Sequence, residues 1–286
     1  MTPLEVLESW LHVRLPEAAF AWLRDQANQV AAHAGDAGLY MAVSLVARKI
    51  GKQDLEATAE ERRAAEHARS GWDPTDWSLD QAARIYLLLS SDADGARFAR
   101  RLDQLCATAD VGELVAFYRG LPLYPDPQRH IERAAEGVRS NMKAVFQAVA
   151  HRNPYPSEQL PEGAWNQMVL KALFVGVRLD PIVGLDRRAN PALARMLTDY
   201  AHERWAASRT ISPELWRCVG PFADGSALDD LERVLATGTD NERAAAALAL
   251  TGAQDRRASA LLNAHPALAQ AIGAGRLTWR SVAQAI

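Results

Sequence analysis

Apolar residues recur at spacings of three and four along almost the whole chain, which is the period of one face of a helix. No run alternates apolar and polar residues with the valine, isoleucine and threonine content typical of a β-strand. Proline and glycine divide the helical pattern into many short segments. The sequence therefore predicts an all-α fold, built as a multi-helical array.

Proline, glycine and capping residues set the limits of the predicted helices. We expect helices over residues 3–14, 16–34, 39–50, 54–69, 128–151, 162–177, 190–208, 213–220, 227–236, 241–251, 256–263 and 266–272, with two or three more between 81 and 120. Gly35 and Gly38 are expected to break the chain before the third of them. Residues 70–77 predict a loop held by two tryptophans, and Ser78 with Gln81 has the spacing of a capping box.

Two changes along the chain suggest three regions. Three prolines fall within residues 121–127, a density that predicts a linker. Beyond residue 222 the predicted helices are short and alanine-rich, which is typical of HEAT-like pairs that stack into a solenoid. We expect an N-terminal helical region (1–120), a central region (121–222) and an α-solenoid-like tail of HEAT-like pairs (223–286), joined in one continuous domain. An irregular helical cap is the alternative for the tail.

Composition narrows the class of protein. The 32 basic and 35 acidic residues give a net charge of -3, which disfavours nucleic acid as a partner. Cys106 and Cys218 are too few for a disulfide framework, and the N-terminus lacks the pattern of an export signal, so we expect a cytoplasmic protein. Residues 164–177 are too short and too polar to span a bilayer, while peripheral contact with a membrane stays open.

One segment combines an apolar surround with a narrow polar stripe. Residues 164–174 are apolar around most of the helix circumference, which predicts a buried helix. Gln167 and Lys171 share a face, with Asn166 beside them. Lys171 is one of only four lysines, so its choice favours a role as a base, a Schiff-base nucleophile or a cation for an anionic ligand. A lysine held in a structural ion pair is the alternative.

Residues 184–190 place Asp186, Arg187 and Arg188 in a short turn before a predicted helix. Such a turn can present a guanidinium to a carboxylate or phosphate. The alternative is that these side chains tie neighbouring helices together.

The next predicted helix carries Asp199, His202 and Glu203 on one face. A carboxylate that orients His202 is the arrangement of a general acid or base. A second Glu-x-x-His motif is missing from the sequence, so we expect no metal site. A hydrogen-bond network that joins helices is the alternative. No nucleophile elbow, P-loop or dinucleotide-binding motif occurs, and the tryptophans of the central region suit either dense packing or the wall of a ligand pocket.

Five motifs, taken in chain order, resemble the EboA family. They are residues 153–156 (NPYP), 164–174 (AWNQMVLKALF), 184–190 (GLDRRAN), 199–205 (DYAHERW) and 213–222 (PELWRCVGPF). The resemblance is densest over residues 110–222. It implies a role in the traffic or processing of secondary metabolites beside other proteins of the ebo cluster, among them a membrane prenyltransferase-like protein. It implies no cofactor and supplies no catalytic residues.

Two functions from different classes follow. The first is a helical adaptor or small-metabolite-binding protein, and the second is an enzyme in which His202, paired with Asp199 or Glu203, acts on a small anionic or aromatic metabolite held by Lys171 or Arg187. A purely structural solenoid scaffold is a third possibility. The candidate ligand-binding residues are Tyr155, Asn166, Gln167, Lys171, Asp186, Arg187, His202 and Glu203, and the candidate catalytic residues are His202, Asp199 and Lys171.

Overall fold

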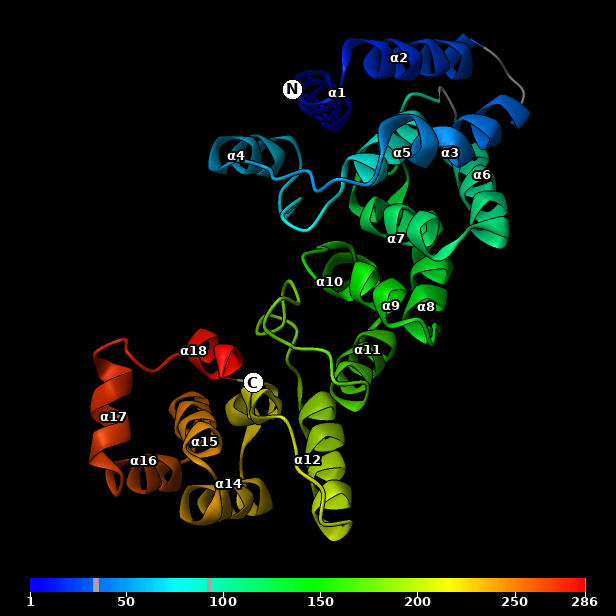
Figure 1. Cartoon of the computed structure of the whole chain (residues 1–286). Coiled ribbons are helices and arrows are strands. Elements are labelled where there is room, and N and C mark those ends of the chain that lie inside the picture. The colour runs from blue at the N-terminus through cyan, green and yellow to red at the C-terminus, as the bar shows by residue number, and fades with distance from the viewer. Residues whose placement is uncertain (33–35, 92–93, 286) are drawn as a thin grey trace. The chain divides into compact units, whose positions relative to one another are not determined.

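The computed structural model describes residues 1–32, 36–91 and 94–285, and the predicted break at Gly35 lies outside them. Within these ranges the chain forms helices α1 to α18 and four 3-10 turns, with no strand (Figure 1). Helix accounts for 72% of the structure, so the prediction of an all-α multi-helical array is confirmed. The chain divides into two compact units, Met1–Leu160 and Pro161–Ile286.

The first unit is built around α5, the most deeply buried of its helices. Its helices are α1 (Pro3–Arg14), α2 (Glu17–Ala32), α3 (Ala37–Ile50), α4 (Ala59–Ala68), α5 (Leu79–Leu89), α6 (Gly95–Thr108), α7 (Val111–Arg119), α8 (Ile131–Arg139), α9 (Lys143–Ala150) and α10 (Tyr155–Gln159). The turns η1 (Leu121–Leu123) and η2 (Pro127–His130) lie between α7 and α8. α5 packs against α1, α2, α3 and α7, and α7 packs in turn against α9.

The burial of α5 includes two charged residues. Asp80 and Arg84 are one helical turn apart, and their side chains are only 4% and 2% exposed. They form an ion pair, and the Ser78 hydroxyl donates a hydrogen bond to Asp80 at 2.5 Å. Pairing makes these charges tolerable inside the unit. The predicted capping box of Ser78 with Gln81 is present at the start of this helix.

Two predicted helix boundaries in the first unit are wrong. The helix expected over residues 54–69 begins only at Ala59, because the preceding strand-like segment is held by backbone bonds to the 70–78 loop: Leu55 N donates to Trp77 O at 2.8 Å. The helix expected over residues 128–151 is divided into η2, α8 and α9. At the second break the Ser140 hydroxyl accepts the Met142 N–H at 3.2 Å, a local bond that competes with helix continuation.

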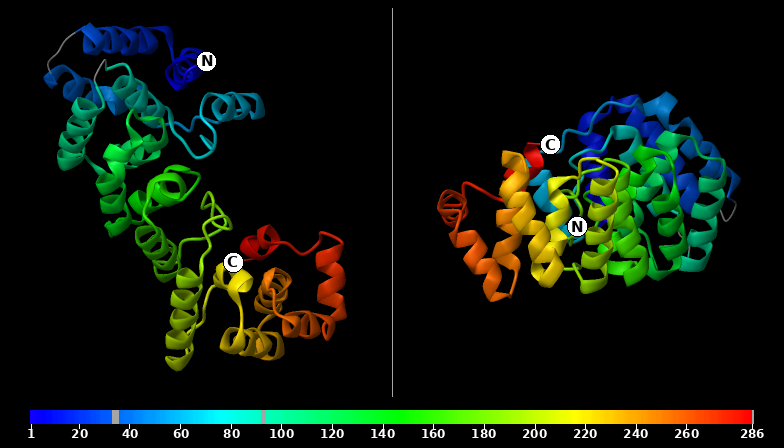
Figure 2. Two further views of the ribbon diagram at one scale, coloured as in Figure 1. Left: turned by 180° about the vertical axis from the view of Figure 1, so that it is seen from behind. Right: turned by 90° about the horizontal axis from the view of Figure 1, so that it is seen from below.

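The second unit is built around α15. Its elements are α11 (Glu162–Phe174), α12 (Pro191–Ala206), η3 (Pro213–Leu215), α13 (Trp216–Val219), η4 (Gly220–Phe222), α14 (Gly225–Thr237), α15 (Asp240–Gly252), α16 (Arg256–Asn263), α17 (Pro266–Gly273) and α18 (Trp279–Gln284). α15 is flanked by α13, α14, α16 and α18 (Figure 2). Its residues 244–250 are all buried, five of them alanines.

Small side chains allow this close packing. A Cβ placed on Gly220 would lie 2.5 Å from the backbone oxygen of Ala249, so only glycine fits at this contact. α14 packs against α15. The HEAT-like and solenoid-like descriptions, and the division into three regions, stay predictions. Residues 121–127 lie inside the first unit, where η1 is buried.

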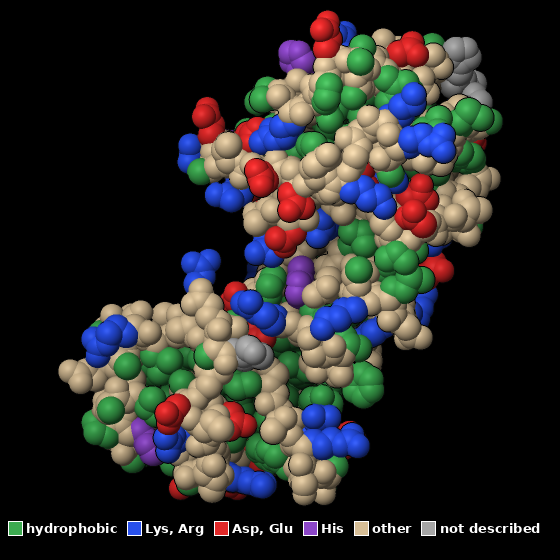
Figure 3. All heavy atoms as spheres, in the orientation of Figure 1, with side chains coloured by type: hydrophobic (Ala, Val, Ile, Leu, Met, Phe, Trp, Pro, Cys, Tyr) green, Lys and Arg blue, Asp and Glu red, His purple; other side chains and the backbone are tan. Residues whose placement is uncertain are grey.

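The surface and the helix lengths bear on possible partners. On the face seen in Figure 3, basic and acidic side chains are interspersed rather than gathered by sign. Among the described residues, no helix combines the length and the apolar content needed to cross a membrane.

Candidate functional site

A groove between α12 and α14 holds two cavities. The first, the Asp199 cavity, has a volume of about 370 Å³ and is lined by Pro191, Ala194, Arg195, Thr198, Asp199, His202, Val219, Phe222, Asp224, Ser226 and Ala227. The second, the Trp205 cavity, has a volume of about 390 Å³ and is lined by Trp205, Ser208, Arg209, Thr210, Ile211, Trp216, Arg233, Val234, Thr237, Gly238 and Glu242. The N-terminal parts of both helices thus line one cavity and their C-terminal parts line the other, so the two helices run in the same direction.

Local sequence signals fix the two ends of α12. Asn190 caps its start, with its side-chain oxygen accepting the Leu193 N–H at 2.9 Å, and Pro191 occupies the first helical position, as predicted. At the other end Ser208 adopts a left-handed conformation, with φ of 54°. Arg204 then holds the returning chain by donating two hydrogen bonds to Thr210 O, at 3.0 and 2.9 Å. This return leads through η3, α13 and η4 to α14.

A hydrogen bond between His202 and Asp230 joins the two helices. His202 Nε2 lies 2.7 Å from Asp230 Oδ2. The His202 side chain is 47% exposed and that of Asp230 is 12% exposed. Because an ionised carboxylate only accepts, this bond places the ring proton on Nε2 and leaves Nδ1 as the second polar atom of the ring. The pair is a carboxylate-oriented histidine at the edge of the Asp199 cavity.

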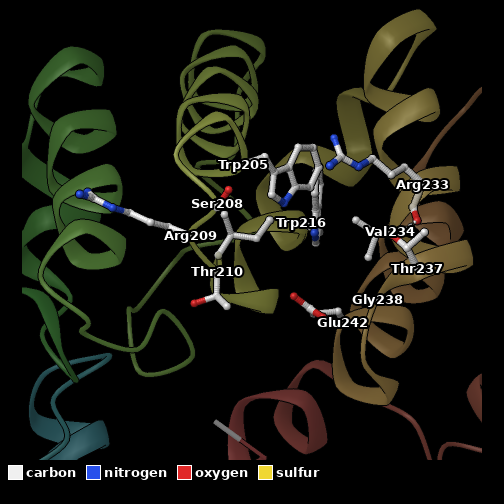
Figure 4. A pocket seen from close by; sticks show the side chains of 11 residues that line it. Trp205, Ser208, Arg209, Thr210, Trp216, Arg233, Val234, Thr237, Gly238 and Glu242 are labelled. Carbon is white, nitrogen blue, oxygen red and sulfur yellow. Dashed lines mark hydrogen bonds between the residues drawn. The ribbon is translucent and has the colours of Figure 1, made fainter.

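One helical turn further along, Trp205 of α12 meets Arg233 of α14. The Arg233 guanidinium carbon lies 4.4 Å from the centre of the Trp205 ring, a close cation–π contact. The Trp205 ring is also 5.9 Å from that of His202 and 5.9 Å from that of Trp216. Figure 4 shows Trp205 and Trp216 next to each other, with Arg233 extended toward them from α14.

The polar groups of the Trp205 cavity are N–H donors, hydroxyls that can donate or accept, and one carboxylate. Trp216 is fully buried, and its indole N–H has no hydrogen-bond partner among the described residues. Thr237 already donates to the carbonyl of Arg233 at 2.9 Å. Glu242 is the one carboxylate of the lining, and it accepts the backbone N–H and the hydroxyl of Thr239, both at 2.8 Å, in the capping box of α15.

The family can be assigned from the sequence match. A family model described as metabolite traffic protein EboA matches residues 4–220. The chain belongs to the EboA family. No curated protein and no solved structure matches it. The matched range contains α12 and Trp216 and ends before α14, so the groove of this EboA-family protein is completed by residues beyond the matched range.

Of the residues that the sequence nominated, Asp199 and His202 line the Asp199 cavity. Glu203 is exposed and lines neither cavity of the groove. From the sequence we expected Asp199 or Glu203 to orient His202. In the structure of this EboA-family chain, His202 is instead hydrogen-bonded to Asp230 of α14.

The polar stripe of α11 lies apart from both cavities. Asn166 is buried and exchanges amide hydrogen bonds with Asn190, at 3.2 and 2.9 Å. Gln167 is exposed, and Lys171 is half-buried with a pKa lowered by burial. Most of residues 164–174 are buried, as the sequence predicts, but Gln167 is exposed and Phe174 at the end of α11 is 76% exposed. The helix is less buried than its apolar composition predicts, because one of its sides faces outward.

The turn of residues 184–190 has a structural partner. Arg217 of α13 donates to both carboxylate oxygens of Asp186, at 2.7 and 2.8 Å. Burial acts to lower the pKa of Arg217, but its bonds and charge interactions with Asp186 and Asp180 raise it overall. Arg187 is exposed and lines neither cavity, while Arg188 lies 4.9 Å from the centre of the Trp165 ring.

Tyr155 belongs to the first unit of the EboA-family chain. Its ring is fully buried, and its hydroxyl donates a hydrogen bond to the carbonyl of Pro127. Burial raises its pKa, so the phenol stays protonated at neutral pH. Lys171 and Asp186 line neither cavity of the groove either, so of Lys171, Asp186 and His202 only His202 does.

The first unit has a smaller cavity of about 170 Å³, the Arg152 cavity. It is lined by Asp73, Asp76, Trp77, Arg119, Gln147, His151, Arg152 and Asn153. Arg152 pairs with Asp76 at 2.6 Å and with Asp73 at 3.2 Å, and Arg119 donates to the carbonyl of Asp76. Across the described parts of the chain, no three histidine, cysteine, aspartate or glutamate side chains are grouped so that they could hold a metal ion.

Sequence reasoning missed Asp230 and Arg233. Both lie in the alanine-rich tail, three residues apart on α14, and both point to α12, one through the bond to His202 and the other through the contact with Trp205. The matching three-residue spacing of His202 and Trp205 was visible in the sequence. What the sequence did not contain was the side-by-side placement of the two helices.

Proposed function

We propose that this EboA-family protein contributes to metabolite traffic by binding a small metabolite in the Trp205 cavity, as a carrier or adaptor rather than as an enzyme. The observation that carries the proposal is the cavity itself. Its volume of about 390 Å³ falls within the range of small-molecule sites. Its lining combines an indole ring with hydroxyl and guanidinium groups, so it offers both an apolar contact surface and groups that orient a ligand.

The family description supports the same function. Metabolite traffic requires that a molecule be held and released, and it requires no covalent step. Trp205 supplies the contact area, and its ring is already fixed between Arg233 and Trp216. A ring held in this way loses little conformational freedom when a ligand packs beside it.

Native mass spectrometry tests the binding function. The purified protein is incubated with a metabolite extract of cells that carry the ebo cluster, and bound small molecules are identified after release. We expect a retained metabolite with the wild-type protein and a loss of it with Trp205→Ala. Phe174→Ala is the matched control, because it removes an exposed aromatic ring of the same unit that lines neither cavity. Equal retention by Trp205→Ala and the control, or no retention by the wild-type protein, would contradict the proposal.

A second candidate function is acid–base catalysis in the Asp199 cavity. The observation that favours it is the 2.7 Å bond between His202 and Asp230 beside a cavity of about 370 Å³. A histidine oriented by a carboxylate can take or give a proton at its other ring nitrogen. His202→Gln and Asp230→Asn should then each abolish the product that depends on the cluster while leaving metabolite retention in place. Unchanged product in both variants would reject catalysis.

The further predictions on partners rest on the family resemblance. We propose other proteins of the ebo cluster as partners, including the membrane prenyltransferase-like protein, and a cytoplasmic location. The exposed Phe174 at the end of α11 is an apolar side chain available for such contacts. Nucleic acid is not among the proposed partners.

A further inference from the structure

We propose that the ligand of the Trp205 cavity is an anion, whose carboxylate or phosphate oxygens are bound by the Arg233 guanidinium and the indole N–H of Trp216. This inference rests on the proposed binding function and adds the chemical class of the ligand. It is carried by two hydrogen-bond donors that line this cavity, the Arg233 guanidinium and the Trp216 indole N–H, for which the described residues provide no acceptor.

Arg233 has no acidic partner in the described part of the chain, although its own helix carries three carboxylates. Asp229 and Glu232 both pair with Arg257, at 2.6 and 2.5 Å. Asp230 pairs with His202. Every acid of α14 is therefore engaged elsewhere, and the guanidinium of Arg233 makes only its contact over Trp205. That contact fixes the plane of the guanidinium while leaving its N–H groups without an acceptor.

Trp216 supplies a second unused donor. Its ring lines the cavity and is fully buried, yet its indole N–H has no acceptor among residues 1–32, 36–91 and 94–285. A buried N–H is normally paired. The indoles of Trp72 and Trp165 are also buried without a partner, but Trp216 is the one of the three that lines a described cavity, where a ligand oxygen would supply the acceptor. In Figure 4 the nitrogen-bearing edge of Trp216 lies on the side of the ring toward Glu242. Because this edge is buried, a ligand oxygen can reach the N–H only if the neighbouring side chains move. The oxygen would then accept the hydrogen bond that the N–H lacks.

The donors that face the tryptophans favour an anion over a cation. The lining has two guanidiniums, Arg209 and Arg233, and one carboxylate, Glu242, which already serves the cap of α15. In Figure 4 the guanidinium of Arg209 points away from the tryptophans, so Arg233 is the cation that faces them. A guanidinium and a neutral N–H are both donors, which an anionic oxygen accepts and a cation does not.

NMR titration of the full-length protein labelled with ¹⁵N tests this inference. The indole N–H signal of Trp216 is assigned as the one lost in Trp216→Phe. The protein is titrated separately with sodium benzoate, with its uncharged analogue benzamide, and with inorganic phosphate, at matched ionic strength. We expect the Trp216 signal to shift with benzoate or phosphate and not with benzamide. A shift with benzoate alone identifies a carboxylate ligand, and a shift with phosphate alone identifies a phosphorylated one.

Two arginine variants complete the test. Arg233→Gln should weaken binding of the anion about tenfold or more, the effect of removing a charge-assisted hydrogen-bonding partner. Arg243→Gln is the matched control, because this arginine lies on the exposed side of α15 and pairs with Asp240. Equal shifts with benzoate and benzamide, no shift with either anion, or wild-type affinity in Arg233→Gln would overturn the proposal. If Arg233→Gln retains the extracted metabolite and Trp205→Ala does not, metabolite binding stands and the anionic class falls.

Discussion

The Arg152 cavity of the first unit and the Trp205 cavity of the second unit differ in what their charges do. In the first, Arg152 is paired with Asp73 and Asp76, so the lining satisfies itself. In the second, the part of the chain that the structure describes offers no acceptor to the Arg233 guanidinium or to the Trp216 N–H. The first cavity has more charges and the second has more unused donors. The proposal of a binding site in the Trp205 cavity therefore rests on unused hydrogen-bond donors beside a cavity rather than on the number of charged residues.

The largest expected effect concerns the buried ion pair of Asp80 and Arg84 in the first unit. Asp80→Ala should leave Arg84 buried with only the distant Glu113, at 3.8 Å, as an acidic neighbour. Breaking a buried pair on one side costs about 3–5 kcal/mol. We expect a loss of that size in the free energy of unfolding, measured by urea denaturation. Asp240→Ala, which removes an exposed partner of Arg243, is the control and should change stability little. Equal effects of the two variants would show that the buried pair has no special role.

A smaller effect is expected at Arg152, which has a φ of 48° in the left-handed region. Arg152→Gly and Arg152→Ala remove the same ion pairs. The left-handed backbone conformation is unfavourable for alanine, whereas glycine adopts it without strain. Arg152→Ala should therefore be about 1–2 kcal/mol less stable than Arg152→Gly in urea denaturation. Indistinguishable unfolding midpoints for the two variants would mean that the backbone relaxes and that the loop is not held by this residue.

For the Trp205 cavity, stability and binding should separate. Arg233 is exposed and its contact with Trp205 is a cation–π interaction, which contributes about 0.5–1 kcal/mol at such sites. Arg233→Gln should lower the unfolding free energy by no more than this amount while it removes most of the anion affinity. The check is to measure both quantities on one preparation. A large loss of unfolding free energy would show that Arg233 has a structural role, like the paired charges of the first unit. The two cavities would then not differ in the way described.

The smallest effect is a pH dependence at His130, in the first unit. Burial lowers the pKa of His130, against its bond to the Pro125 carbonyl and the charges of Asp103 and Asp126. The unfolded chain binds this proton more readily, so the contribution of neutral His130 is complete above the unfolded pKa of about 6.5 and is lost as the pH falls toward the lower folded value. Thermal midpoints between pH 7.5 and 5.5 should fall less steeply in His130→Gln than in the wild-type protein. Parallel curves would contradict the expected shift.

Helix positions in this chain were predictable where the signal is local. The cap at Asn190, the first-turn Pro191 and the capping box of Ser78 all acted as the sequence indicated. The start of α4 was not predictable, because residues 51–58 are held by backbone bonds to the distant 70–78 loop. A local pattern of charges favours helix there, and a tertiary contact overrides it.

The candidate site was predictable only in part. Helical periodicity placed Asp199 and His202 on one face of α12, and both line a cavity. The contacts of α12 with Asp230 and Arg233 of α14 could not be predicted, because the periodicity of one helix does not indicate which helix lies beside it. Lys171 drew attention through its rarity, yet it lines neither cavity of the groove. The scarcity of lysine in the sequence thus did not predict which residues line these cavities.

The alanine run of α15 has a geometric consequence for the groove. Helix axes approach one another only as closely as the side chains between them allow, and alanines at residues 244–247 and 249 keep that separation small. The close approach of Gly220 to Ala249 sets the position of α13, which carries Trp216, relative to α15, which carries Glu242. The width of the Trp205 cavity thus depends on alanine side chains that do not line it. A larger side chain at such a position would therefore be expected to change the width of the Trp205 cavity without adding any group to its lining.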